Sequence, residues 1–353
     1  MTYKDTLFFV GKCLTINHEE HNRIDVEKEL KAGLVNWDNV VKVSTSHYVF
    51  PALYCNLKRA NFLDYLPNDL VEYMQHITDL NRERNEQIIE QAKEINELLL
   101  ENNITPIFLK GTGNLLSGLY NDIAERMVGD IDFLVSYSDY DKVINIFLEN
   151  GYSSVIKIDN VLPPDKHFPR IHKENRIAAV EIHKEMVKRP YAKLFNYGYV
   201  KDNILSKNNI SVLSFQDQLK LSIIAKQVND DGQFFNDISL RNAYDVFLLS
   251  HKTDTIKSIH SLDKQLKIPL NNFLAITKLV LNSESVKFIH NDSSQKYIEK
   301  FLYLTNNKII REKHHRFLKK RLFISSRLSI ILKSFYKKDY FYWFMKRLFQ
   351  GKP

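Results

Sequence analysis

Residues 104–135, the stretch that decides the fold, read ITPIFLKGTGNLLSGLYNDIAERMVGDIDFLV. The stretch opens with a short β-rich run that ends at a Lys-Gly-Thr sequence, and it closes with an apolar run that contains Asp130 and Asp132. Alternate residues of a strand share one face, so both carboxylates are expected to point to the same side, with Ile131 and Phe133 turned into the core. Two acids held side by side repel each other, and a divalent cation between them would offset that repulsion. The stretch therefore predicts a metal-dependent site for phosphoryl or nucleotidyl transfer.

The D-x-D pattern alone leaves two interpretations open, because surface strands also alternate acidic and apolar residues. Here Met127 and Val128 precede the acids and residues 133–135 follow them, so both flanks are apolar and favour a buried strand. Buried carboxylates require compensation by cations or hydrogen-bond donors. A metal site is the preferred interpretation, and a strand end with solvated acids is the alternative.

Lys110, Gly111, Thr112 and Gly113 form a turn between the first predicted strand and a helix-compatible segment. Glycines at such a turn let backbone N–H groups approach phosphate oxygens, and the start of the helix adds a favourable dipole. Thr112 offers a hydroxyl and Lys110 a positive charge. The spacing is not that of a P-loop, and a tight turn that binds nothing is an equal alternative.

A third β-like run, residues 176–183, carries Glu181 and His183 on one face. A carboxylate at Glu181 would complete a set of three acids with Asp130 and Asp132, enough to hold two Mg²⁺ ions. The alternative for Glu181 is a satisfied edge-strand residue, and a packed histidine is the favoured interpretation of His183. The ordered set of strand, glycine turn, helix, D-x-D and later acid favours the metal site.

These motifs together resemble the nucleotidyltransferase superfamily related to DNA polymerase β, and more closely the family described as uncharacterised nucleotidyltransferases. The resemblance is densest over residues 104–183, with weaker likeness on either side. It is carried by Leu109-Lys110-Gly111, Tyr120, Arg126, Asp130-Ile131-Asp132-Phe133-Leu134-Val135 and Glu181-Ile182-His183, and more weakly by Trp37, residues 47–53, Arg241 and Asp245.

The resemblance implies a role for each site residue. Gly111 and Thr112 would hold the triphosphate of an NTP, Asp130 and Asp132 would bind both metals, and Glu181 would serve the catalytic metal and activate the acceptor. The implied cofactor is Mg²⁺, or Mn²⁺ in its place. This chain departs from the superfamily in having Gly-Thr where Gly-Ser is usual, and Glu rather than Asp as the third acid.

Two cations and a helical pair complete the candidate set. Lys110 and Arg126 suit contacts with phosphate, although either could instead pair with a nearby acid. Arg241 and Asp245, four residues apart, are expected to form an i,i+4 pair on one helix.

Periodicity along the chain predicts an α+β fold in four parts. The parts are an N-terminal helical region (1–80), a nucleotidyltransferase core with a small mixed β-sheet (81–190), a helical domain (191–310) and a basic amphipathic tail (311–353). Helices are expected over residues 81–100, 140–149, 218–228 and 239–251, the third of them capped by Ser214 with Asp217.

Positive charge is concentrated at the end of the chain. Residues 309–353 contain 13 Lys and Arg against two acids, a net charge of +11, whereas the whole chain carries +8 and the first 308 residues therefore carry −3. From residue 315 to 349, aromatic and aliphatic residues interleave with these cations. The favoured interpretation is a helix packed on the body; an anionic membrane surface and an RNA backbone are the alternatives.

The two cysteines show no metal-ligand spacing and are too few for a disulfide framework, which fits a reducing compartment. No signal peptide and no apolar run long enough to span a membrane are recognised. A cytoplasmic protein is expected, peripheral to the membrane if the tail binds lipid.

The expected activity is transfer of a nucleoside monophosphate from an NTP to a hydroxyl acceptor, with release of pyrophosphate. A small molecule, a sugar, a protein side chain and a tRNA end are all compatible acceptors. The alternative is a catalytically degenerate fold that binds nucleotide, RNA or a membrane surface.

Overall fold

The structure is a computed structural model that describes residues 1–154 and 166–350, without the side chains of residues 347, 348 and 350. Its helices are α1 (Tyr3–Cys13), α2 (Glu20–Lys31), α3 (Trp37–Ser46), α4 (Phe50–Arg59), α5 (Asn68–Glu101), α6 (Lys110–Leu116), α7 (Tyr140–Glu149), α8 (Tyr197–Val200), α9 (Phe215–Ile224), α10 (Gly232–Phe235), α11 (Leu240–Ser250), α12 (Thr255–His260), α13 (Lys264–Leu281), α14 (Asp292–Asn306), α15 (Lys308–Ser334) and α16 (Lys338–Gln350). Its strands are β1 (Ile107–Phe108), β2 (Asp130–Leu134), β3 (Ser153–Ser154), β4 (Ile171–His172), β5 (Ala179–His183), β6 (Ile204–Lys207) and β7 (Ile210–Leu213).

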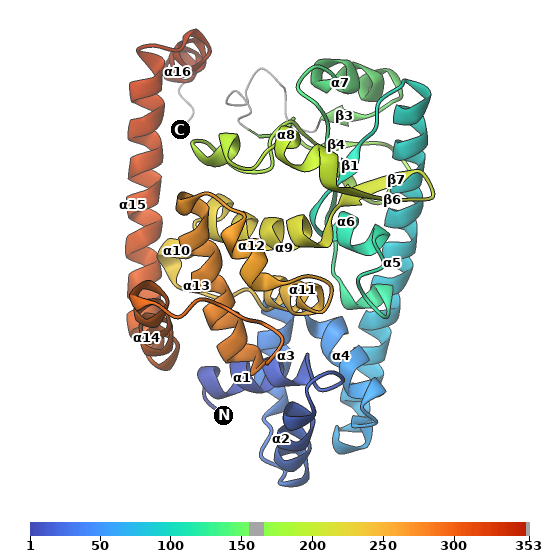
Figure 1. Cartoon of the computed structure of the whole chain (residues 1–353), viewed down its shortest axis with the longest axis vertical. Coiled ribbons are helices and arrows are strands. Elements are labelled where there is room, and N and C mark those ends of the chain that lie inside the picture. The colour runs from blue at the N-terminus through green and yellow to red at the C-terminus, as the bar shows by residue number, and fades with distance from the viewer. Residues whose placement is uncertain (155–165, 351–353) are drawn as a thin grey trace.

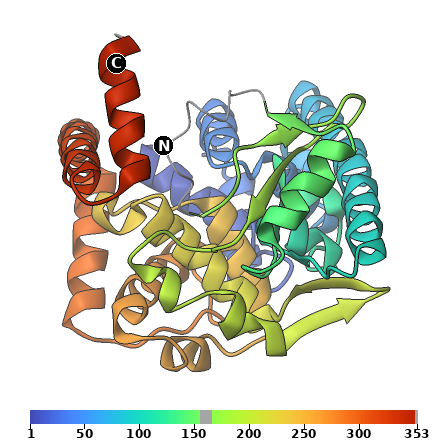
Figure 2. The same ribbon diagram turned by 90° about the horizontal axis from the view of Figure 1, so that it is seen from above.

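The strands form one mixed sheet in the order β3-β4-β5-β2-β1-β7-β6. β2 pairs in parallel with β5, β1 pairs in parallel with β7, and β1 pairs with β2 in the antiparallel sense. Helices from the N-terminal part of the chain and helices from its C-terminal part flank this sheet (Figures 1 and 2). The predicted α+β fold with a small mixed sheet is confirmed.

Helix α5 is the long element that leads into the sheet, and Figure 1 shows it along one edge of the molecule. It buries Ile88, Ala92, Ile95 and Leu99, which recur every three or four residues and so form one apolar face. The helix predicted over residues 81–100 lies inside α5, which begins earlier, directly after Pro67.

Other predicted elements agree closely with the structure. α7 has the expected bounds, α11 spans residues 240–250, and α9 begins after Ser214, whose hydroxyl accepts a hydrogen bond from the Asp217 backbone N–H. α9 ends at residue 224, and a π-helical turn continues it to residue 229.

The sheet also takes two strands, β6 and β7, from the region predicted as the helical domain. α5 in turn crosses the boundary expected after residue 80. The division into four parts therefore stays a prediction, and its last three residues, 351–353, lie outside the described part of the chain.

Candidate functional site

The pairing of β2 with β5 places the candidate acids next to each other. The two strands run in parallel with Asp132 directly opposite Glu181. Ile131 and Ile182 are fully buried and turn to the other side of the sheet, into the core, as the alternation of the two strands predicts. Asp132 and Glu181, 49 positions apart in the chain, therefore lie side by side on one face of the sheet.

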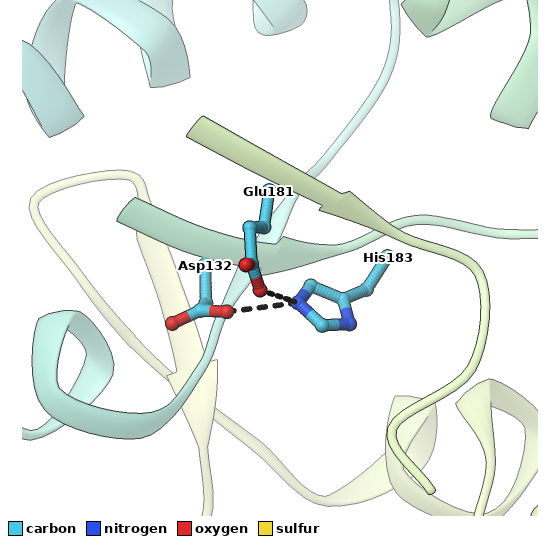
Figure 3. A group of neighbouring side chains, drawn as sticks. All are labelled: Asp132, Glu181 and His183. Carbon is cyan, nitrogen blue, oxygen red and sulfur yellow. Dashed lines mark hydrogen bonds and ion pairs between the residues drawn. The ribbon is translucent and has the colours of Figure 1, made fainter. Parts of the chain in front are cut away.

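Asp132, Glu181 and His183 form a compact buried group, which we call the acid cluster (Figure 3). Nε2 of His183 lies 2.8 Å from Oδ1 of Asp132 and 3.3 Å from Oε2 of Glu181. One ligand atom from each residue lies within 4.8 Å of the others, so the three could hold a metal ion. The packed histidine expected from sequence thus faces both carboxylates.

The orientation of His183 depends on its other ring nitrogen. Nδ1 lies 3.3 Å from the backbone carbonyl of Glu185, which accepts a hydrogen bond when this nitrogen carries the proton. In that tautomer the lone pair on Nε2 repels the two carboxylate oxygens that it faces, whereas in the other tautomer Nε2 carries the proton and donates to them. A cation shared by all three atoms would relieve that repulsion, as in metal sites where the second nitrogen of the ligand is fixed by a carbonyl.

Lys110 supplies positive charge to the acid cluster. Its Nζ lies 2.6 Å from Oδ1 of Asp132 and 3.5 Å from Oε2 of Glu181. Burial acts to lower the pKa of Lys110, but the two carboxylates outweigh burial and raise this pKa above its usual value. Its backbone is in the left-handed region, with φ of 51°, at the point where β1 passes into α6. The ammonium thus sits where the two acids require a cation.

Arg170 links the acid cluster to Asp130. Its Nη2 lies 2.8 Å from Oδ2 of Asp130, and its Nε lies 2.8 Å from Oε1 of Glu181. Burial raises the pKa of Asp130, and the neighbouring carboxylates of Glu181 and Asp132 add to this effect, while Arg170 opposes it.

The charge on Glu181 is stabilised by its neighbours. Burial acts to raise the pKa of Glu181, but the hydrogen bond from His183 and the charge of Lys110 outweigh it and hold this pKa well below its usual range. Glu181 is therefore an anion at neutral pH.

A cavity of about 390 Å³ opens beside the acid cluster. Six of the seven residues predicted for the site line it: Lys110, Gly111, Arg126, Asp130, Asp132 and Glu181. The seventh, Thr112, is 1% exposed, and its hydroxyl donates to the backbone carbonyl of Asp130 at 3.0 Å. Its expected contact with phosphate stays a prediction, since the hydroxyl is hydrogen-bonded inside the fold.

Two glycines of the turn have steric reasons to be glycine. A Cβ on Gly113 would lie 2.6 Å from the carbonyl oxygen of Phe108, and one on Gly111 would lie 3.0 Å from Cγ2 of Val128. The turn is therefore packed tightly against the preceding strand and against the loop that leads into β2.

Arg126 belongs to a separate buried network, which we call the Asp245 network. Its Nε lies 3.0 and 3.1 Å from the two carboxylate oxygens of Asp245, and the hydroxyl of Tyr120 donates to Oδ1 of Asp245 at 2.7 Å. The i,i+4 pair expected between Arg241 and Asp245 is wrong, because Asp245 is paired with Arg126 and Arg241 lies over the ring of Tyr48.

Sequence reasoning missed several residues that line the cavity. Lys166 and Arg170 line the cavity and lie shortly before β4, in a segment without helical or strand periodicity. Burial and, secondarily, the charge of Lys110 lower the pKa of Lys166. Burial and, secondarily, the charge of Arg126 lower the pKa of Arg241. No local signal in the sequence distinguishes Lys166 and Arg170 from surface cations, whereas Arg241 was among the residues that carry the weaker family resemblance.

The model of the family described as Uncharacterised nucleotidyltransferase matches residues 34–279. This match covers well over half of the chain, so the protein belongs to that family, and the resemblance to this family that its sequence shows is confirmed. A search of curated proteins found no match. Membership of this family supports a transferase with a nucleotide as substrate.

Proposed function

We propose that the protein transfers a nucleoside monophosphate from an NTP to a hydroxyl acceptor and releases pyrophosphate. The observation that carries this proposal is the direct opposition of Asp132 and Glu181 on parallel strands, with Asp130 lining the same cavity. Membership of a nucleotidyltransferase family supports the reaction class.

The donor groups fit a divalent cation. Asp130, Asp132 and Glu181 offer carboxylate oxygens, the ligands that Mg²⁺ and Mn²⁺ prefer, and Nε2 of His183 adds an imidazole that suits Mn²⁺ better than Mg²⁺. Bound here, divalent ions would polarise the phosphate oxygens and stabilise charge on the departing pyrophosphate.

In the proposed reaction, the acceptor hydroxyl oxygen forms a bond to the α-phosphorus of the NTP. The bond from that phosphorus to the oxygen bridging to the β-phosphate breaks, and its electron pair leaves with pyrophosphate. The proton of the acceptor hydroxyl passes to Glu181 and from there to water.

Cations along the cavity would receive the triphosphate. Lys110 now compensates Asp132 and Glu181, the same charge that a divalent ion would compensate, so metal binding would free its ammonium for a phosphate oxygen. Lys166 and Arg241 line the same cavity, and burial acts against the charge of both, which makes an anionic ligand favourable there.

The test is label transfer with purified protein. Each of the four NTPs, labelled at the α-phosphate, is incubated with Mg²⁺ or Mn²⁺ and a cell extract, and the molecules that gain label are separated. Wild-type protein is expected to label an acceptor, and the Asp130→Ala and Asp132→Ala variants are expected not to. Equal transfer by wild type and both variants would refute the proposal.

One observation favours a second candidate function, a degenerate fold that binds nucleotide without transferring it. Lys110 and Arg170 already pair with the three acids at 2.6–3.5 Å, so two of the three negative charges are compensated within the protein itself. Calorimetric binding of an NTP by a protein that labels no acceptor with any of the four NTPs would favour this candidate.

A further inference from the structure

Helices α15 and α16 form the last part of the described chain, and Figure 1 shows α15 along the edge of the molecule opposite α5, with α16 turning across its end. The beginning of α15 contacts the body. Arg311 lies 3.8 Å from the ring centroid of Tyr3, His315 stacks edge-on against Phe235, and Leu318 is 7% exposed. The rest of α15 presents its side chains mostly to solvent.

Large apolar side chains form an exposed stripe along this helix. The stripe consists of Phe317, Ile324, Leu328, Ile331 and Phe335, which are 65%, 47%, 55%, 39% and 82% exposed. Their spacing of seven, four, three and four residues places them on one side of a helix. Packing on the body, the interpretation that the sequence favoured, is therefore wrong for this stripe.

Cations flank the stripe. Lys319, Lys320, Arg321 and Arg327 are all exposed, and residues 319–346 contain eight Lys and Arg against one acid, Asp339. The following helix adds exposed aromatic rings at Phe341 and Tyr342. The surface thus combines a strong positive charge with an uncovered apolar stripe.

We propose that this surface docks on an anionic lipid membrane, with the stripe entering the boundary between headgroups and acyl chains. Lysine and arginine side chains beside the stripe reach anionic headgroups while their apolar stems lie along the lipid, and aromatic rings suit the same interface. Among the described residues, no helix is long and apolar enough to cross a membrane, so the attachment is peripheral.

Other binding partners would complement either the positive charge or the apolar stripe of this surface, but not both. A nucleic acid would neutralise the cations but leave the aliphatic stripe in water. A second copy of the chain would cover the stripe but bring the same positive charge against it. An anionic bilayer supplies both the negative charge and the apolar boundary. This inference does not depend on the proposed transferase activity.

Co-sedimentation of the full chain with vesicles tests the proposal. The protein is expected to sediment with phosphatidylcholine vesicles that contain phosphatidylglycerol and to stay in solution with phosphatidylcholine alone. Replacing three cations, Lys319→Gln, Lys320→Gln and Arg321→Gln, is expected to weaken binding about a hundredfold, at about fivefold for each charge. Replacing three stripe residues, Ile324→Ser, Leu328→Ser and Phe335→Ser, is expected to weaken it at least about tenfold.

Matched variants elsewhere on the surface serve as controls. Ile24→Ser, Leu34→Ser and Leu80→Ser remove apolar residues of similar exposure, and Lys42→Gln, Lys201→Gln and Lys207→Gln remove three exposed cations. Vesicle binding should survive both sets, and thermal unfolding should show that all variants fold.

Three results would overturn the proposal: equal binding to both kinds of vesicle, equal losses in the control variants, or self-association that disappears in the stripe variant without any vesicle binding. Binding of single-stranded RNA that the stripe variant retains, with no vesicle binding, would assign the surface to nucleic acid instead.

Discussion

The acid cluster and the Asp245 network both place buried charge against the same cavity, yet their chemistry differs. In the Asp245 network one carboxylate receives Nε of Arg126 and the hydroxyl of Tyr120, so cation and anion are matched inside the protein. In the acid cluster, Asp132 and Glu181 share Lys110 and one nitrogen of His183, and Glu181 also pairs with Arg170, which it shares with Asp130.

This difference shows that burial of charge does not by itself mark a functional site. In a matched pair each charge has its partner inside the protein, so no further ion is needed. Such a pair stabilises the fold only as long as both partners remain. Around the acid cluster, three carboxylates share two cations, Lys110 and Arg170, so negative charge is in excess and a further cation can bind. We interpret the acid cluster as the metal site and the Asp245 network as a structural link between the core and α11.

Removing one acid of the cluster should have the largest effect. Asp132→Asn is expected to lower label transfer by at least about a thousandfold, because it deletes a metal-binding oxygen where the transition-state charge is stabilised. Initial rates of labelled product formation measure this loss. Retention of more than about a tenth of the wild-type rate would contradict the assignment of Asp132.

Breaking the Asp245 network should instead reduce stability. Asp245→Asn leaves the guanidinium of Arg126 buried without its counter-ion, and the free energy of unfolding is expected to fall by about 3 kcal/mol. Urea denaturation followed by circular dichroism measures the change. If Asp245→Asn left stability unchanged but abolished metal binding, the roles of the two groups would have to be exchanged.

His183 should have an intermediate effect on the metal. His183→Gln keeps a polar side chain but removes the ring nitrogen between the two carboxylates, and Mn²⁺ affinity is expected to fall by about ten- to a hundredfold. Calorimetric titration with Mn²⁺ gives the dissociation constant, and His172→Gln, which changes an exposed histidine on β4, is the control. Equal losses in the two variants would remove His183 from the metal site.

His47, a partly buried histidine outside both groups, is expected to have the smallest effect, on the pH dependence of stability. Burial lowers the pKa of His47 to about 4, and its ring contacts the hydroxyl of Tyr3 and the backbone N–H of Leu240 rather than a carboxylate. Between pH 6.5 and 4 the unfolded state takes up a proton that folded His47 does not, so stability falls as the pH falls. The expected loss is about 1–2 kcal/mol, reduced by the partial exposure of the ring.

Unfolding of wild type and His47→Gln at pH 7 and pH 5 measures this effect. The variant should show a weaker dependence on pH. An identical dependence in both proteins would mean that His47 contributes nothing to it.

Much of this fold could be predicted from local sequence, because β2, β5, α7 and α11 have regular apolar spacing. The hairpin of β6 and β7 was missed, although Asn208 and Asn209, both with left-handed φ, are a typical two-residue turn. β7 pairs with β1, about 100 residues earlier, and periodicity carries no information on such pairing.

The same limit applies to the site. The sequence identified Asp132 and Glu181 as candidates, but the register that places them opposite each other, and His183 between them, is a property of the sheet. Arg170 lies in a segment without periodicity, and the pairing of Arg126 with Asp245 spans 119 residues. Contacts between residues that are distant in the sequence cannot be predicted from local sequence patterns.

Binding of Mn²⁺, followed by the electron paramagnetic resonance signal of the free ion, tests the central claim most directly. Wild type, Asp132→Asn and Asp245→Asn are titrated at a temperature where all three are folded. We expect wild type and Asp245→Asn to bind the ion with similar affinity and Asp132→Asn to lose binding. Binding by Asp132→Asn that equals wild type, or no binding by any of the three proteins, would contradict the assignment of the acid cluster as a metal site.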